Sequence, residues 1–265
     1  MKPIIVRGRP LGQGGSPLVC VPVVGSTTDA VCAEARAMAS LVQARDPAVP
    51  DLLEWRVDAF GLVVDAAAPS TTALVAAAAA LREAAGDLPL LVTLRAAREG
   101  GRDHGLDDGA RAALLVTLIE TGVADLVDFE TDADPAALDT LRAACRRRGV
   151  PLVLSAHHFS GTPSAGDMVA AFARAAALGA DVAKLAVMPQ DVRDVDSLLA
   201  ATAEADRSLA IPLVSMAMGG IGVASRVVGS RYGSCITWAS AGAPSAPGQL
   251  PLAELRRRLR EELAR

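Results

Sequence analysis

Two of the three histidines in the sequence are neighbours, His157 and His158, in the stretch SAHHFSGTP. A histidine gains and loses a proton near neutral pH and can also bind a metal ion, so the pair could serve acid–base chemistry or a metal site. The apolar run that leads into the pair is typical of a β-strand. Because neighbouring side chains on a strand point to opposite faces, only one of the two can face a given site. The pattern excludes a two-histidine metal pair and predicts one acid–base histidine, while the other packs outward or caps the loop.

A lysine, Lys184, interrupts the apolar run VAKLAV. Apolar surroundings favour the neutral amine, which can attack a ketone or aldehyde and form an imine, or Schiff base. The residue types alone leave two interpretations open, an imine-forming lysine or a structural lysine paired with Glu54 or Glu130. The histidines favour the first, because an imine acidifies the neighbouring C–H group and a base must then collect the proton.

Other ionisable residues interrupt apolar runs near their C-terminal ends. An ionisable group inside an apolar strand is costly unless it is paired, so several such groups at one end of a sheet indicate a functional site. The candidates besides His157 and Lys184 are Glu54, Arg56, Asp58, Arg95 and Glu99.

Eight short runs rich in β-branched residues alternate with alanine-rich stretches of helical periodicity. This alternation predicts an α/β fold, and eight strand–helix units are the number in a (β/α)₈ barrel, whose active site lies at the C-terminal ends of the strands. The glycine-rich sequence at 12–15 precedes the first run, which is the wrong side for a dinucleotide-binding loop. We expect one domain over residues 1–265, with residues 1–17 as an N-terminal lead-in. The predicted strands cover residues 18–24, 52–60, 89–96, 125–130, 151–159, 181–188, 212–219 and 233–240.

The composition restricts the partners and the location of the protein. The formal net charge is −4 and no block rich in Lys and Arg is interleaved with aromatic residues, so nucleic-acid binding is not expected. The longest uninterrupted apolar run, residues 73–81, is far shorter than the roughly 20 residues of a membrane-spanning helix. The four cysteines stand apart, without the spacing of a disulfide framework or a zinc site. These features predict a cytoplasmic protein with a small-molecule substrate, no membrane contact and no bound metal.

Six separated motifs occur in the order found in one enzyme family. They are EWRVD (54–58), TLRAAREGG (93–101), SAHHF…TP (155–163), ADVAKLAVMPQ (180–190), SMAMGGIGVASR (215–226) and SAPGQL (245–250). With these motifs the sequence resembles the type I 3-dehydroquinate dehydratases, hydro-lyases of the shikimate pathway, from about residue 18 to its C-terminus. The resemblance implies a (β/α)₈ barrel and a homodimer. It also implies dehydration of 3-dehydroquinate to 3-dehydroshikimate through a lysine imine, without a metal or organic cofactor.

The resemblance further implies a role for each matching residue. Lys184 resembles the Schiff-base lysine, and His157, third in SAHHF, resembles the acid–base histidine. Glu99 and Glu54 resemble the carboxylates that orient the histidine and bind a substrate hydroxyl. The residues that resemble the polar clamp on the substrate, and the contacts of a lid loop at 242–250, are Arg56, Arg95, Arg226, Ser245 and Gln249.

The residue types suit these roles. A planar guanidinium offers paired donors to a carboxylate, which suits Arg226 for an acidic substrate. The lid sequence GAPSAPGQ has glycine near both ends and proline for stiffness, so it can close over an imine and exclude water. Two places depart from the family's usual pattern. His158 stands where Asp or Asn is common, and the stretch TWASAGAPSAPGQ contains Trp and Ser.

Two other functions fit part of the pattern. A class I aldolase also forms a lysine imine in a (β/α)₈ barrel, but it often binds a phosphate near strands seven and eight. In that region this sequence has an arginine suited to bind a carboxylate. A non-catalytic barrel that serves as a binding module would not need Lys184, His157 and Glu99 together.

Overall fold

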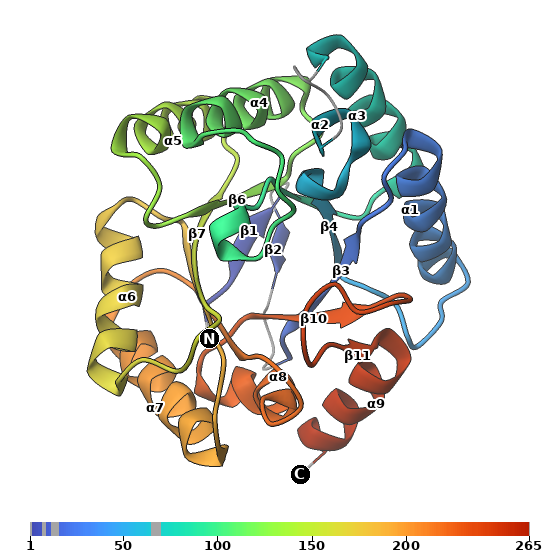
Figure 1. The fold of residues 1–265 in the computed structure, drawn as a ribbon. Coiled ribbons are helices and arrows are strands. Elements are labelled where there is room, and N and C mark those ends of the chain that lie inside the picture. The colour runs from blue at the N-terminus through green and yellow to red at the C-terminus, as the bar shows by residue number, and fades with distance from the viewer. Residues whose placement is uncertain (1, 7–8, 12–15, 65–69, 265) are drawn as a thin grey trace. The chain divides into compact units, whose positions relative to one another are not determined.

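The strands and helices group into two compact units. The computed structural model describes residues 2–6, 9–11, 16–64 and 70–264. The terminal unit comprises Met1–Val21 and Val153–Arg265, and the central unit comprises Pro22–Leu152. In each unit, parallel strands alternate along the chain with helices (Figure 1). The single domain expected over residues 1–265 stays a prediction.

The central unit is built on neighbouring parallel strands with a fixed register. Arg56 lies opposite Thr93, and Thr93 lies opposite Asp128. The strands are β4 (Leu52–Arg56), β5 (Leu90–Thr93) and β6 (Leu126–Glu130), preceded by β3 (Leu18–Val23), which spans the boundary between the units. The helices are α1 (Thr28–Gln43), α2 (Gly61–Val64), α3 (Thr71–Ala85), α4 (Asp108–Thr121) and α5 (Pro135–Arg148), with the 3₁₀ turns η1 (Val57–Ala59) and η2 (Ala97–Glu99).

The terminal unit contains a second set of parallel strands. Ser155 lies opposite Lys184, and Lys184 lies opposite Val214 on the next strand. The strands are β7 (Leu152–His158), β8 (Val182–Val187), β9 (Leu213–Ala217), β10 (Ile236–Ser240) and β11 (Leu250–Pro251), with the antiparallel hairpin of β1 (Ile4–Val6) and β2 (Arg9–Leu11). The helices are α6 (Ala165–Ala177), α7 (Val192–Ser208), α8 (Val223–Val228) and α9 (Leu252–Leu263), with the 3₁₀ turn η3 (Gly229–Tyr232).

All eight predicted strands are present, and each is shorter than the apolar run that predicted it. The run at 52–60 shows why: the strand ends at Arg56, and the chain turns at once into η1. Two features were not predicted. The lead-in at 1–17 contains the hairpin of β1 and β2, and the lid loop ends at Gln249 because Leu250 begins β11. The glycine-rich sequence at 12–15 lies outside the described residues.

Side-chain caps explain where several helices begin and end. Ser164 accepts a hydrogen bond from the Asp167 backbone N–H at the start of α6. After α6, Gly179 has φ of 86°, a conformation that favours glycine. At α1 the cap is Thr27, whose side chain accepts from the Ala30 backbone N–H. These caps are local in sequence, which is why residue types alone can predict them.

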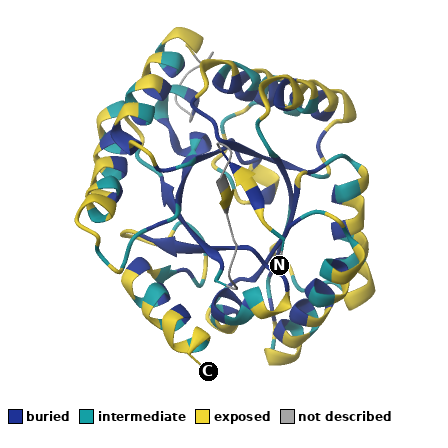
Figure 2. Ribbon diagram, turned by 180° about the vertical axis from the view of Figure 1, so that it is seen from behind, coloured by how far each residue is buried: buried dark blue, intermediate teal, exposed yellow. Residues whose placement is uncertain are grey.

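The strands are buried along almost their whole length, and the helices expose their outer faces (Figure 2). This two-sided burial produces the continuous apolar runs of the sequence. Charged residues on these strands are therefore exceptions, and they include Glu54, Asp128, Glu130 and Lys184, each at most 6% exposed. Among the described residues, no helix has the length and apolar character needed to cross a bilayer.

A glycine pair before α8 gives a direct test of the packing against β9. A Cβ at Gly222 would lie 2.2 Å from the Ala217 carbonyl oxygen, whereas a Cβ at Gly220 would meet nothing within 4 Å. We expect Gly222→Ala to lower the free energy of unfolding by about 1–3 kcal/mol, because the backbone must shift. Gly220→Ala is the matched control and should stay within about 0.5 kcal/mol of the wild type. Urea unfolding of both variants measures this, and equal stabilities would contradict the close approach.

Candidate active site

One face of the central strands carries a cluster of polar side chains. The register places Glu54, Arg56, Thr93 and Asp128 on the same face, because paired residues on adjacent strands point the same way. The Thr93 hydroxyl donates a hydrogen bond to Glu54 Oε1 at 2.8 Å. Glu54 is only 4% exposed, so this bond meets part of the need of a buried carboxylate.

Arg95, which follows β5, joins this face through two carboxylates of β6. Its Nη1 lies 2.8 Å from Glu130 Oε1, and its Nη2 lies 2.8 Å from Asp128 Oδ1. Burial alone would lower the pKa of Arg95, but the two carboxylates outweigh it and raise that pKa above its usual value. Arg95 is therefore held as a fixed cation. Arg95 was predicted as a site residue from the sequence, whereas Asp128 was not.

Arg111 of α4 is a second buried partner that the sequence analysis missed. It is 1% exposed, donates from Nε and Nη2 to the Leu94 carbonyl oxygen, and binds Glu130 with the same Nη2. Its guanidinium carbon lies 4.7 Å from the centre of the Phe129 ring. An arginine on a helix of this type is normally a surface residue, so no local signal identifies Arg111.

Arg56 is paired with Asp58 rather than with Glu54. Its Nε and Nη2 bind the two Asp58 oxygens at 2.9 and 2.8 Å. The same carboxylate accepts the backbone N–H groups of Arg95 and Arg102. Burial would raise the pKa of Asp58, but the hydrogen bond and charge of Arg56 lower it below the usual range. Asp58 therefore stays ionised and ties the ends of β4 and β5 together.

Glu99, in η2, has the opposite electrostatic environment. It is 8% exposed, and burial raises its pKa to about 8. Arg95 works against this shift, while Glu130 and Asp132 add to it, and the protonated carboxyl donates a hydrogen bond to Asp132. Glu99 therefore keeps its proton at neutral pH in this environment and is a hydrogen-bond donor there.

The terminal unit brings Lys184 and His157 to one face of β7 and β8. Ser155 lies opposite Lys184, and His157 lies opposite Ala186, so the side chains of all four residues point the same way. His157 is half-buried and its ring stacks on Phe159, with centroids 6.5 Å apart, whereas His158 is exposed.

Lys184 is 6% exposed, and its Nζ lies 4.5 Å from the centre of the Trp238 ring of β10. A desolvated ammonium over an aromatic face gains cation–π energy. The sequence analysis noted Trp238 only as a departure from the family pattern. The structure shows that this tryptophan forms part of the wall around the lysine.

Arg226 of α8 is a buried cation of a different kind from Arg95. It is 2% exposed, and its Nη2 donates to the Pro247 carbonyl oxygen at 3.0 Å. Its Nη1 lies 3.7 Å from the Met216 sulfur, and its Nε has no hydrogen-bond partner among the described residues. Burial lowers its pKa to about 10, which still leaves the group charged at neutral pH. A buried cation with an unsatisfied donor is suited to bind an anion.

Ser245 and Gln249 close the predicted lid loop on itself. The Ser245 backbone N–H donates to Gln249 Oε1 at 2.9 Å, and Gln249 Nε2 donates to the Ser245 hydroxyl at 3.0 Å. Gly248 has φ of 77°, and a Cβ there would lie 2.3 Å from the Gly219 carbonyl oxygen. The loop therefore packs closely on the turn between β9 and α8, next to Arg226.

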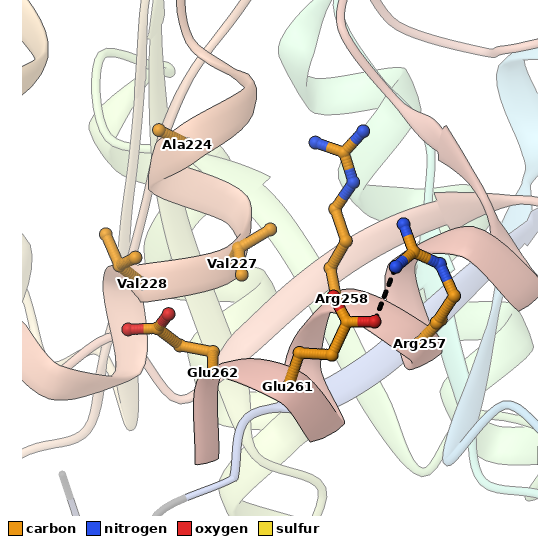
Figure 3. Close-up of a pocket in the computed structure, with 7 residues that line it drawn as sticks. All are labelled: Ala224, Val227, Val228, Arg257, Arg258, Glu261 and Glu262. Atoms are coloured by element: carbon orange, nitrogen blue, oxygen red, sulfur yellow. Dashed lines mark hydrogen bonds and ion pairs between the residues drawn. The ribbon is translucent and has the colours of Figure 1, made fainter. Parts of the chain in front are cut away.

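A hollow of about 390 Å³ lies elsewhere in the terminal unit, between α8 and α9 (Figure 3). None of the predicted site residues lines it. Arg257 in its wall is paired with Glu261 and Glu254, so its charge is neutralised within the surface of α9. The residues around the hollow are Ala224, Val227, Val228, Arg257, Arg258, Glu261 and Glu262. Within the described ranges, no group of three or more His, Cys, Asp or Glu side chains is arranged to hold a metal ion.

The chain resembles known proteins over nearly its full length. The family model for type I 3-dehydroquinase matches residues 19–263. A 3-dehydroquinate dehydratase of Albidiferax ferrireducens is 44% identical over 96% of this chain and 92% of the relative. One from Geobacillus thermodenitrificans is 40% identical over 92% and 90%.

Two solved structures also match the chain over nearly its full length. The crystal structure of 3-dehydroquinate dehydratase from Geobacillus kaustophilus matches with a TM-score of 0.89 and 39% identity, covering 99% of this chain and 97% of that one. The type I enzyme from Clostridium difficile, solved with covalently modified comenic acid, matches with a TM-score of 0.89 and 33% identity, covering 99% and 98%. These matches confirm the predicted α/β class and the predicted (β/α)₈ barrel fold. The chain belongs to the type I 3-dehydroquinase family.

Proposed function

We propose that this chain is a type I 3-dehydroquinate dehydratase, a hydro-lyase that converts 3-dehydroquinate to 3-dehydroshikimate through an imine on Lys184. The observation that carries the proposal is the common face of Lys184 and His157 on adjacent strands, two residue pairs apart in the register. An imine-forming amine and a proton-accepting group are the two parts that this elimination needs.

The reaction balances with these groups. The Lys184 amine attacks the substrate ketone and a water molecule leaves, which forms the imine. The protonated imine withdraws electrons from the neighbouring C–H bond, and His157 takes that proton. The electron pair moves to form the C–C double bond, the substrate hydroxyl leaves with a proton as water, and a final water molecule hydrolyses the imine and releases Lys184.

Arg226 binds the substrate carboxylate. Its charge is buried and its Nε lacks a partner among the described residues, so a carboxylate would restore the hydrogen bond that the fold leaves unmade. The lid at 242–249 rests on the same helix through the contact from Arg226 to Pro247, and Ser245 and Gln249 cover the bound imine. Exclusion of water strengthens each of these polar contacts.

The family resemblance supplies the roles of the central-unit residues. Glu54, Arg56 and Arg95 bind substrate hydroxyl groups, and Glu99 assists proton transfer by the histidine. The protonated state of Glu99 makes it a donor before substrate binds, and this state depends on its burial. The same resemblance supports a homodimer, a cytoplasmic location, and catalysis without a metal or organic cofactor.

Replacement of the lysine tests the imine directly. We expect Lys184→Ala to abolish dehydration of 3-dehydroquinate, because no other amine lies in its place, while the protein remains folded. Incubation of the wild type with 3-dehydroquinate and borohydride should add the mass of a reduced adduct to Lys184, as intact and peptide mass spectrometry would show. Normal turnover by folded Lys184→Ala protein would falsify the imine mechanism.

The two histidines should differ sharply in their effect on turnover. His157→Ala should lower kcat by about 10²–10⁴, the range expected for the loss of a general acid–base group. His158→Asn is the matched control and should be mild, because His158 is exposed on the opposite face of β7. The measurement is a pH–rate profile of both variants beside the wild type. A larger loss in His158→Asn would show that the assignment of the working histidine is wrong.

The raised pKa of Glu99 predicts a pH dependence of stability. The unfolded chain releases this proton near pH 4.5, whereas the folded chain keeps it up to about pH 8. Stability contributed by the protonated group is therefore lost progressively as the pH rises from about 4.5 to about 8, and is then constant. Urea unfolding at pH 5 and pH 8.5 should show that the wild type loses stability relative to Glu99→Gln. A stability difference that does not change with pH would exclude a raised pKa.

A further inference from the structure

The third histidine, His104, makes two backbone hydrogen bonds close to the candidate active site. It lies in the loop between η2 and α4 and is half-buried. The Leu106 backbone N–H donates to its Nδ1 at 3.2 Å, and its Nε2 lies 3.2 Å from the Arg95 carbonyl oxygen. No motif of the sequence analysis includes this residue.

The two backbone partners define the state of the His104 ring. A backbone N–H can only donate, so Nδ1 must be the unprotonated acceptor, and a carbonyl can only accept, so Nε2 must carry the hydrogen. The neutral ring with its hydrogen on Nε2 is the one form that satisfies both bonds. In a protonated ring Nδ1 would also carry a hydrogen, and this donor would face the Leu106 N–H, which is a donor as well.

Both backbone polar groups of Arg95 are therefore hydrogen-bonded, and the Ala96 N–H, in the same peptide as the Arg95 carbonyl, donates to Glu130. The Arg95 N–H donates to Asp58 Oδ1 at 3.2 Å, and the Arg95 carbonyl oxygen accepts from His104. Gly101 packs against the same carbonyl, because a Cβ there would lie only 2.1 Å from it. The Gly101 and Glu99 backbone N–H groups both donate to the Ala96 carbonyl oxygen. The tight turn that carries Glu99 thus starts from a peptide whose orientation His104 helps to set.

The side chain of Arg95 does not need His104 in the same way. Its guanidinium is fixed independently by Asp128 and Glu130. Loss of the His104 contact should therefore disturb the turn from Ala96 to Gly101, and with it Glu99, more than it disturbs the Arg95 guanidinium. Because His104 is only half-buried, water can replace its two hydrogen bonds, so the fold itself should tolerate the loss.

We infer that His104 is a positioning residue, which holds Glu99 in its working place through the Arg95 carbonyl. The inference rests on the proposed dehydratase function, in which Glu99 assists the proton transfers. His104 acts through the backbone and has no direct part in the chemistry.

The kinetic test compares three variants. His104→Ala should lower kcat about tenfold, as expected for one misplaced hydrogen-bonding group, with a change in KM of less than about twofold. Arg102→Ala is the matched control, because its side chain is exposed in the same loop and only its backbone N–H contacts Asp58. His104→Gln should recover most of the lost rate, since its amide can donate to the Arg95 carbonyl. Equal kcat values for His104→Ala and Arg102→Ala would overturn the inference.

A second readout does not depend on turnover. Carbon-13 NMR of the Glu99 carboxyl group measures its titration midpoint, and His104→Ala should move that midpoint down toward 4.5 as the turn loosens and water enters. Arg102→Ala should leave the midpoint unchanged. If the wild type proves inactive on 3-dehydroquinate, the proposed function fails, but the NMR comparison still decides the role of His104. An unchanged midpoint in His104→Ala would overturn that role.

Discussion

The central unit depends on the Glu130 carboxylate. Glu130 is fully buried on β6, and it accepts from Arg95, from Arg111 of α4 and from the Ala96 backbone N–H. One carboxylate therefore joins β6, the segment that follows β5, and the helix α4. Removal of one member of such a group leaves buried charge without compensation, which is far more costly than the loss of a surface ion pair. The orientation of Arg95, and through its backbone that of Glu99, follows from this group.

The terminal unit handles buried charge differently. Arg226 has no carboxylate partner within the described ranges, and burial lowers its pKa to about 10. Lys184 lies against the Trp238 ring, a neighbour that stabilises a cation without neutralising it. Among the described residues, Arg226 thus retains an attraction for an anionic ligand.

The parts of this structure that were predictable from sequence are those governed by short-range pattern. The alternation of apolar runs predicted the eight strands, and strand parity predicted that His157 and His158 point to opposite faces. The register that places His157 on the same face as Lys184 comes from the structure. The hairpin of β1 and β2 was not predicted, because strands of three residues are too short to show the alternation of apolar and polar residues. Arg111 and His104 were not predicted as site residues, because packing rather than sequence spacing brings them to their partners, Glu130 and the Arg95 carbonyl. The protonation of Glu99 likewise depends on burial that residue types do not reveal.

The three arginines predicted to bind the substrate differ in how many of their donors the protein already uses. Arg56 already uses two of its donors on Asp58, and Arg95 uses both terminal nitrogens on Asp128 and Glu130. A substrate carboxylate at either one would have to compete with a protein carboxylate already in place, and it would enter a face rich in negative charge. Arg226 presents no such competition, since among the described residues it contacts a carbonyl oxygen and a thioether. Of the three, Arg226 is therefore the best suited to bind a carboxylate, and the other two arginines are better suited to a neutral hydroxyl, which can accept one further hydrogen bond without displacing a carboxylate.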